Sequence, residues 1–89
     1  MKTYCVIGLG RFGSEVARKL CQQGCEVLAL DVRSDLVQQI AGDVTHAVVG
    51  DAKDKEVLRA LGVSNFDCAI IAIGSDLAEI AAVFCNKIE

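Results

Sequence analysis

Four short apolar runs recur along the chain, with roughly 20 residues from the start of one to the start of the next. They cover residues 4–7, 27–30, 47–49 and 68–73. Each run is rich in β-branched residues and has glycine or aspartate near its ends, which is typical of buried strands. The spacing leaves room for one helix and two short loops between strands. The pattern therefore predicts a repeating strand–helix fold.

The stretches between the runs predict helices. In the first, apolar residues from Phe12 to Cys21 recur at helical spacing, and Gly24 is placed to end the helix. Ser34 can cap a second, short helix that Gly42 closes. Asp54 can cap a third helix, which closes at Gly62.

A fourth helix is expected after the last apolar run. Asp76 and Glu79 have the spacing of a capping box. An apolar stripe at helical spacing follows them, formed by Leu77, Ile80, Ala81, Phe84 and Ile88.

The element order is thus βαβαβαβα, which predicts an α/β fold, a Rossmann-like doubly wound parallel sheet with helices on both faces. The chain has 89 residues and is 53% apolar but only 4% aromatic, as expected for one small domain over residues 1–89 with a sheet buried on both sides. The domain is expected to stop before its last strands. Residues 70–73 would then form an apolar sheet edge that needs a partner.

Charge and hydropathy exclude further classes of protein. The net charge of −3 argues against a nucleic-acid binder, which needs a basic face. No apolar run approaches the ~20 residues of a membrane span, and no signal-peptide pattern is present, so a cytoplasmic protein is expected. The five cysteines show no metal-ligand or disulfide spacing and are interpreted as reduced packing thiols.

A glycine loop, Gly8-Leu9-Gly10-Arg11-Phe12-Gly13, follows the first predicted strand and opens the first predicted helix. Only in that context does a GxGxxG pattern indicate a dinucleotide site. Gly8 permits a tight turn, Gly10 allows the backbone to approach a pyrophosphate, and Gly13 lets the helix pack closely on the sheet. The helix N-terminus would face the phosphates.

An acidic residue supports this interpretation. Asp31 ends the second predicted strand 18 residues after Gly13, where a carboxylate can accept hydrogen bonds from adenosine ribose hydroxyls. It would repel a 2′-phosphate, which favours NAD over NADP. The alternative is a solvated loop aspartate. Arg33 could pair with a phosphate or be solvated.

Arg11 and Asp51, which are also expected near the carboxyl ends of the strands, keep two interpretations each. Arg11 could clamp phosphate oxygens or be a surface arginine at a helix start. Asp51 could accept the adenine amino group or cap a turn, with Ala52 against the base. Gly74 would let the backbone approach the ligand, while Asp76 is interpreted as a helix cap.

No catalytic set can be assembled from these residues. His46, the only histidine, precedes the third predicted strand, at the end opposite the ligand rim, and is interpreted as a surface or packing residue. No Ser/His/Asp set or metal cluster is evident. The sequence therefore predicts a nucleotide site in a protein that is not an enzyme.

The glycine loop, together with residues 26–31, 45–52 and 70–74, resembles the RCK N-terminal domain, also called the TrkA-N or KtrA-type domain. This is a regulatory module of potassium channels and of Trk/Ktr potassium-uptake systems. The resemblance runs over essentially the whole chain. It implies that NAD(H) or ATP/ADP binds as a regulatory ligand and is not turned over.

The resemblance also implies roles for individual residues. Arg11 would contact the terminal phosphate of a nucleotide, Asp31 the ribose, and Ile73-Gly74 would close the site. Arg33 departs from the small polar residue often found at its position. The full set of expected ligand-binding residues is Gly8, Leu9, Gly10, Arg11, Phe12, Gly13, Asp31, Val32, Arg33, Asp51, Ala52, Ile73 and Gly74.

Family members form dimers that assemble into a ring beneath a membrane pore, and the ligand changes the shape of the dimer. The resemblance therefore implies a homo-oligomer, a membrane potassium channel or transporter subunit as partner, and no nucleic acid. A complete family domain adds two further strands and a helix. The alternative function is the cofactor-binding half of an NAD-dependent oxidoreductase, and a third is a scaffold that binds nothing.

Overall fold

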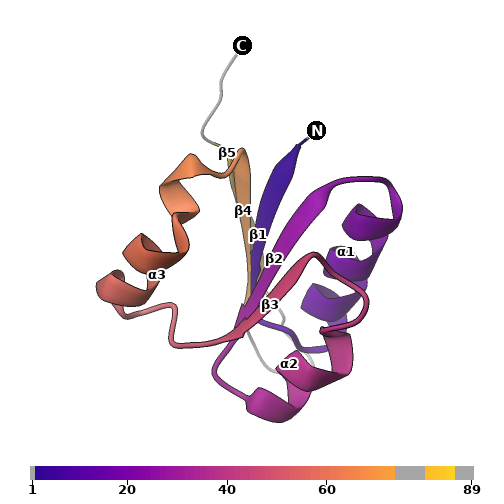
Figure 1. The fold of residues 1–89 in the computed structure, drawn as a ribbon, viewed down its shortest axis with the longest axis horizontal. Helices are drawn as coiled ribbons and strands as arrows, with labels where there is room; N and C mark the ends of the chain where they lie inside the picture. Colours follow the sequence, from indigo (N-terminus) through magenta and orange to yellow (C-terminus); the bar gives the residue numbers. More distant parts are fainter. Residues whose placement is uncertain (1, 74–79, 86–89) are drawn as a thin grey trace.

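A computed structural model describes residues 2–73 and 80–85 of the chain. One sheet of five strands has the order β3-β2-β1-β4-β5 (Figure 1). The strands are β1 (Thr3–Ile7), β2 (Glu26–Asp31), β3 (His46–Val49), β4 (Cys68–Ile73) and β5 (Ile80–Cys85). The helices are α1 (Arg11–Gln22), α2 (Ser34–Ile40), α3 (Lys55–Leu61) and a short 3-10 turn, η1 (Val63–Asn65).

Strands β1 to β4 are parallel, as the apolar runs predict. β1 lies between β2 and β4, with Cys5 opposite Leu28 on one side and Ala69 on the other. The chain winds from β1 outward through β2 to β3, and then crosses back to β4 on the other side of β1. The strand order therefore reverses at β1 and β4, and ligands of doubly wound sheets bind at the carboxyl ends of the strands around such a point.

Helices cover both faces of the sheet. Figure 1 shows α1 and α2 on one side and α3 on the other. Alternate residues of β1 serve the two sides: Val6 belongs to the core cluster that Ala17 of α1 and Val37 of α2 join, whereas Cys5 and Ile7 belong to a second cluster. Apolar side chains of α3 pack against that second cluster. The period of two along a strand explains why both faces of the sheet are apolar.

The sequence predicted the ends of α1 and α3 correctly. Gly24, just beyond α1, has a φ of +91° in the left-handed region that favours glycine. Asp54 caps α3 by accepting a 2.9 Å hydrogen bond from the main-chain nitrogen of Glu56, and Gly62 ends the helix with a φ of +69°.

The prediction for the start of α2 was wrong by one residue. Ser34 is the first helical residue, and Arg33 occupies the N-cap position in an extended conformation without a side-chain cap. The main-chain nitrogen of Arg33 is held by the carboxylate of Asp31, 2.9 Å away, so the turn out of β2 fixes where the helix begins. α2 ends at Ile40, two residues before Gly42.

The predicted fourth helix is wrong for residues 80–85. These residues form β5, which pairs antiparallel with β4 from Ile73↔Ile80 to Cys68↔Cys85. Every residue of the segment Ile-Ala-Ala-Val-Phe-Cys is apolar, so the stripe at helical spacing was part of a run without a polar face. The proposed cap residues Asp76 and Glu79, with Leu77 and Ile88, lie outside the described residues.

The expectation of an unpaired apolar edge at β4 is therefore also wrong. β5 hydrogen-bonds to β4, and β3 forms the opposite edge of the sheet. Pairing satisfies main-chain groups that an apolar edge would leave open, which favours a strand over a helix here.

The cysteines differ in state. Cys5 is a buried free thiol, and Cys21 and Cys25 are half-buried free thiols that pack against the core. Cys68 is disulfide-bonded, so the expectation that all five cysteines are reduced is wrong for this residue. Over the described residues, no helix has both the length and the apolar character to cross a membrane.

Candidate functional site

A pocket of about 340 Å³ lies where β1, β2 and β3 end. Six of its lining residues are among the predicted ligand-binding residues: Gly8, Asp31, Val32, Arg33, Asp51 and Ala52. Four were not predicted: Ile7, Leu30, Gly50 and Lys53. The topology brings these loops together because the carboxyl ends of parallel strands share one edge of the sheet.

The glycine loop leaves β1 through a turn that requires glycine. Gly8 has a φ of +98°, and its main-chain nitrogen donates a 2.9 Å hydrogen bond to the carbonyl oxygen of Leu30. Gly13, in the first turn of α1, is buried against Gly8. A Cβ atom at position 13 would overlap the carbonyl oxygen of Gly8 and lie 3.3 Å from the Cβ of Ala72. This glycine lets the start of α1 pack against the loop and the sheet.

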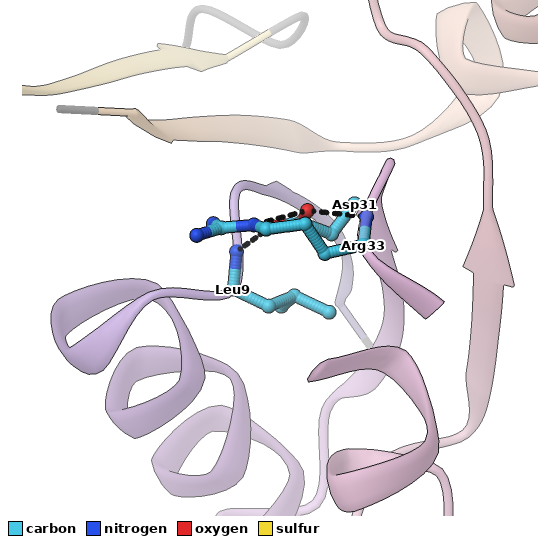
Figure 2. Close-up of polar contacts among 3 residues, drawn as sticks. All are labelled: Leu9, Asp31 and Arg33. Atoms are coloured by element: carbon cyan, nitrogen blue, oxygen red, sulfur yellow. Dashed lines mark hydrogen bonds and ion pairs between the residues drawn. The ribbon is translucent and has the colours of Figure 1, made fainter. Parts of the chain in front are cut away.

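The centre of the polar network is Asp31, the last residue of β2. Its side chain is only 4% exposed, and Figure 2 shows it between Leu9 of the glycine loop and Arg33. Oδ2 accepts hydrogen bonds from the main-chain nitrogen of Leu9, at 2.7 Å, and from Nη2 of Arg33, at 3.0 Å. Oδ1 accepts from the main-chain nitrogen of Arg33, at 2.9 Å, and from its Nε, at 3.0 Å. The interpretation of Asp31 as a solvated loop residue is therefore wrong.

These contacts fix the charge of Asp31. Burial pushes the pKa of the carboxyl upward, but the hydrogen bonds from the Arg33 side chain and from the nitrogens of Leu9 and Arg33, with the Arg33 charge, outweigh it. The pKa of Asp31 is therefore lower than that of an ordinary aspartate. Its hydrogen bond to Asp31 likewise raises the pKa of the Arg33 guanidinium.

Five residues of the glycine loop lie outside the pocket lining: Gly13, described above, and Leu9, Gly10, Arg11 and Phe12. Leu9 is 2% exposed and its side chain packs in the core, so only its main chain takes part in the site. Gly10 is the N-cap of α1 and carries no side-chain cap. Arg11 and Phe12 are exposed, and the first turn of α1 has no acidic residue. A cation at a helix N-terminus is unfavourable unless an anion lies near it, so this end of α1 suits a phosphate group.

The loop after β3 forms the opposite wall. Gly50 donates a 3.0 Å hydrogen bond to the carbonyl oxygen of Asp31, which ties this loop to β2. Oδ1 of Asp51 accepts a 2.9 Å hydrogen bond from the main-chain nitrogen of Lys53. Asp51 thus shapes a turn and lines the pocket at the same time, so both interpretations of it stay open. Lys53 brings an exposed cation to the rim; its place directly after Gly50-Asp51-Ala52 is the signal that could have found it.

The remaining predicted residues follow β4. Ile71 is the β4 partner of Ile7, so Ile73 lies two residues further toward the carboxyl edge of the sheet. Gly74 and Asp76 lie outside the described residues. His46 is exposed at the first residue of β3, the end of the strand opposite the pocket. Among the residues that the structure describes, no three His, Cys, Asp or Glu side chains gather as metal ligands.

The pocket combines an apolar wall with a few polar groups, as small-molecule sites do. Ile7, Leu30, Val32 and Ala52 supply apolar surface, and Val32 is 59% exposed. Asp31 supplies a fixed carboxylate. Both Arg33 and Lys53 are cations, which balance Asp31 and Asp51. The arrangement suits a flat, partly apolar ligand that carries hydroxyl groups and extends toward α1 with an anionic group.

Comparison with known proteins places this geometry in context. The model of the TrkA-N domain family matches residues 4–88. Ktr system potassium uptake protein C of Bacillus subtilis (strain 168) is 46% identical over 76 residues, 85% of this chain and 34% of that protein. Ktr system potassium uptake protein A of Vibrio alginolyticus is 40% identical over 87 residues, 97% of this chain and 40% of that protein. The chain thus spans between 34% and 40% of the length of these relatives.

Proposed function

Because the chain belongs to the TrkA-N domain family, we propose that it is the nucleotide-sensing part of a cytoplasmic regulatory subunit of a potassium-uptake system. Relatives at 46% and 40% identity are named potassium uptake proteins, which supports the transport role. The chain covers less than half of each relative, so the activity of the whole protein is part of the proposal.

One observation carries the ligand assignment. A buried, ionised carboxylate, Asp31, lies at the edge of the pocket and bonds to the main-chain nitrogen of Leu9 in the glycine loop. A carboxylate in this position suits the ribose hydroxyls of a nucleotide, because they are donors and it only accepts. The phosphates then extend from Gly8 toward the start of α1 and Arg11.

The ligand is an adenine nucleotide, either NAD(H) or ATP/ADP, bound as a regulator. Val32 and Ala52 offer apolar surface to the base, and Asp51, in the same loop as Ala52, would accept its amino group. Arg11 would neutralise the phosphate furthest from the ribose.

Regulation follows from unequal binding to two shapes of a dimer. A nucleotide that binds one shape more tightly shifts the population toward it, and the dimer transmits that shift to a membrane transporter subunit. The nucleotide can shift the equilibrium only by its difference in affinity between the two shapes. Loops from β1, β2 and β3 meet at one pocket, so a ligand there contacts several segments of the domain at once.

The test is thermal unfolding with NAD, NADH, NADP, ATP, ADP and AMP. At 100 times its Kd, a ligand that binds only the folded state adds about 2.7 kcal/mol to the free energy of unfolding. We expect a rise in Tm with at least one nucleotide that lacks a 2′-phosphate, and a smaller rise for Asp31→Ala. Asp43→Ala removes an exposed carboxylate that pairs with Arg18 away from the pocket, so it should respond like the wild type.

Two results would contradict the proposal. A Tm that does not respond to any adenine nucleotide would contradict the ligand assignment. Loss of NADH absorbance with small carbonyl substrates would favour an oxidoreductase. Potassium uptake by cells that carry the intact subunit tests the transport role. Asp31→Ala should uncouple uptake from nucleotide there, and Asp43→Ala should not.

A further inference from the structure

Every acceptor position of the Asp31 carboxylate is filled in this structure. An ionised carboxylate has about four lone-pair sites, two on each oxygen. Oδ2 accepts from the main-chain nitrogen of Leu9 and from Nη2 of Arg33, and Oδ1 accepts from the main-chain nitrogen and Nε of Arg33. A ligand hydroxyl can therefore bond to Asp31 at full strength only if one of these donors leaves.

The four donors differ in how easily they can leave. Two are main-chain nitrogens fixed by the fold, since Leu9 begins the turn into α1 and Arg33 is the N-cap of α2. The other two belong to the guanidinium of Arg33, whose side chain is 56% exposed, whereas that of Asp31 is 4% exposed. Rotation of this half-exposed side chain disturbs less packing than movement of either main-chain nitrogen would. The guanidinium is thus the exchangeable donor (Figure 2).

We propose that Arg33 is an internal competitor at the nucleotide site, which occupies the hydroxyl-binding oxygens of Asp31 in the empty domain and must swing away when ribose binds. This inference rests on the proposed function, because it assumes that ribose is the group that Asp31 receives. It makes Arg33 a residue that sets affinity without contacting the bound ligand.

The exchange is balanced in hydrogen bonds, and its cost is the loss of the ion pair between Arg33 and the buried Asp31 carboxylate. Two ribose hydroxyls replace the two guanidinium donors, so Asp31 keeps four partners. The released guanidinium moves into solvent near Asp35, whose charge already acts on Arg33. The free-energy cost of releasing Arg33 lowers the apparent affinity for any ribose ligand. The same holds for any protein whose binding-competent state is only partly populated.

Simple electrostatics predicts the opposite effect of removing Arg33. A cation beside the site should attract a nucleotide phosphate, so its loss should weaken binding. An internal competitor gives tighter binding when it is removed. Isothermal titration with ADP separates the two accounts.

We expect Arg33→Ala to bind ADP about 1.5- to 5-fold more tightly than the wild type, the range that a partly exposed ion pair can provide. Arg33→Lys keeps the charge but loses the two-point fork, so its Kd should fall between the two. Arg59→Ala is the matched control: it removes an exposed arginine that pairs with Glu56 on α3, and its Kd should equal that of the wild type.

The Nε–Hε NMR signal of Arg33 supplies a second measurement. In the protein without ligand, this signal should be sharp and shifted away from the position of a solvated arginine. It should move toward that position when ADP is added. Equal or weaker ADP binding by Arg33→Ala overturns the competitor while leaving the proposed function intact. Tighter binding of NADP than NAD, lost in Arg33→Ala, would also overturn it, because Arg33 would then contact a phosphate. Failure of both wild type and Arg33→Ala to bind any adenine nucleotide overturns the proposed function itself.

Discussion

The main-chain nitrogen of Leu9 donates a 2.7 Å hydrogen bond to Oδ2 of Asp31, and this bond joins the glycine loop after β1 to the end of β2. The same carboxylate holds the main-chain nitrogen of Arg33, where α2 begins. One buried side chain therefore sets the relative position of two loops that line the pocket. Its structural role and its proposed ligand role are coupled.

The first prediction concerns stability. Asp31→Ala should lower the free energy of unfolding by about 1–3 kcal/mol, because the nitrogen of Leu9 loses its partner in a buried place. Urea unfolding measures the difference. Asp43→Ala breaks an ion pair whose side chains are 34% and 51% exposed, and should cost less than about 1 kcal/mol. Equal losses in the two variants would mean that the Leu9–Asp31 bond does not stabilise the fold.

The second prediction concerns pH. The pKa of Asp31 is lowered in the folded state, so ionisation of this group stabilises the fold above its unfolded pKa of about 3.9. That contribution is lost as the pH falls through the lower, folded pKa. The stability advantage of the wild type over Asp31→Asn should therefore be constant near neutral pH and shrink below about pH 4. An advantage that grows on acidification would contradict the direction of the shift.

The sequence predicted most of the fold because its signals were local. The runs that form β1 to β4, the cap at Asp54 and the glycines at 24 and 62 each follow from a few neighbouring residues. The motifs around Gly8 and Asp31 also identified the family correctly. β5 was missed because its identity depends on a distant partner: Ile80–Cys85 is apolar throughout, and it is the open edge of β4 that selects a strand.

The site was predicted in part. The chain order brought Gly8, Asp31 and Asp51 to one edge, since parallel strands impose it. The two-point contact between Arg33 and Asp31 could not be predicted, because a spacing of two residues does not determine whether their side chains meet. The direction of the Leu9 side chain, into the core, likewise depends on how the loop packs against the sheet.

The third prediction concerns the glycine loop. Gly13→Ala should strongly destabilise the domain or displace the start of α1, because its Cβ would overlap the carbonyl oxygen of Gly8. Gly42→Ala is the control, since a Cβ there meets no atom within 4 Å. It should leave stability unchanged or raise it by about 0.4–1 kcal/mol. Chemical denaturation of the two variants measures both effects, and a neutral Gly13→Ala would contradict the close packing.

The fourth prediction concerns thiol reactivity. Burial raises the pKa of the Cys5 thiol to about 11, so almost none of it is ionised at pH 8. Alkylation of Cys5 should be about 100-fold slower in the native protein than in urea. The half-buried thiols of Cys21 and Cys25 should show much less protection. Mass spectrometry of a short iodoacetamide pulse measures each site, and rapid native labelling of Cys5 would contradict its burial.

The most direct test of the central claim, that an adenine nucleotide occupies the pocket, is an NMR titration of main-chain amides with ADP and with NADH. We predict saturable shifts at residues 8–13, 31–33 and 50–53, the three loops at the carboxyl ends of β1, β2 and β3, with little change at His46 on the opposite end of β3. Absence of shifts with both ligands, or shifts that avoid the loop containing Leu9 and the end of β2 at Asp31, would contradict the account.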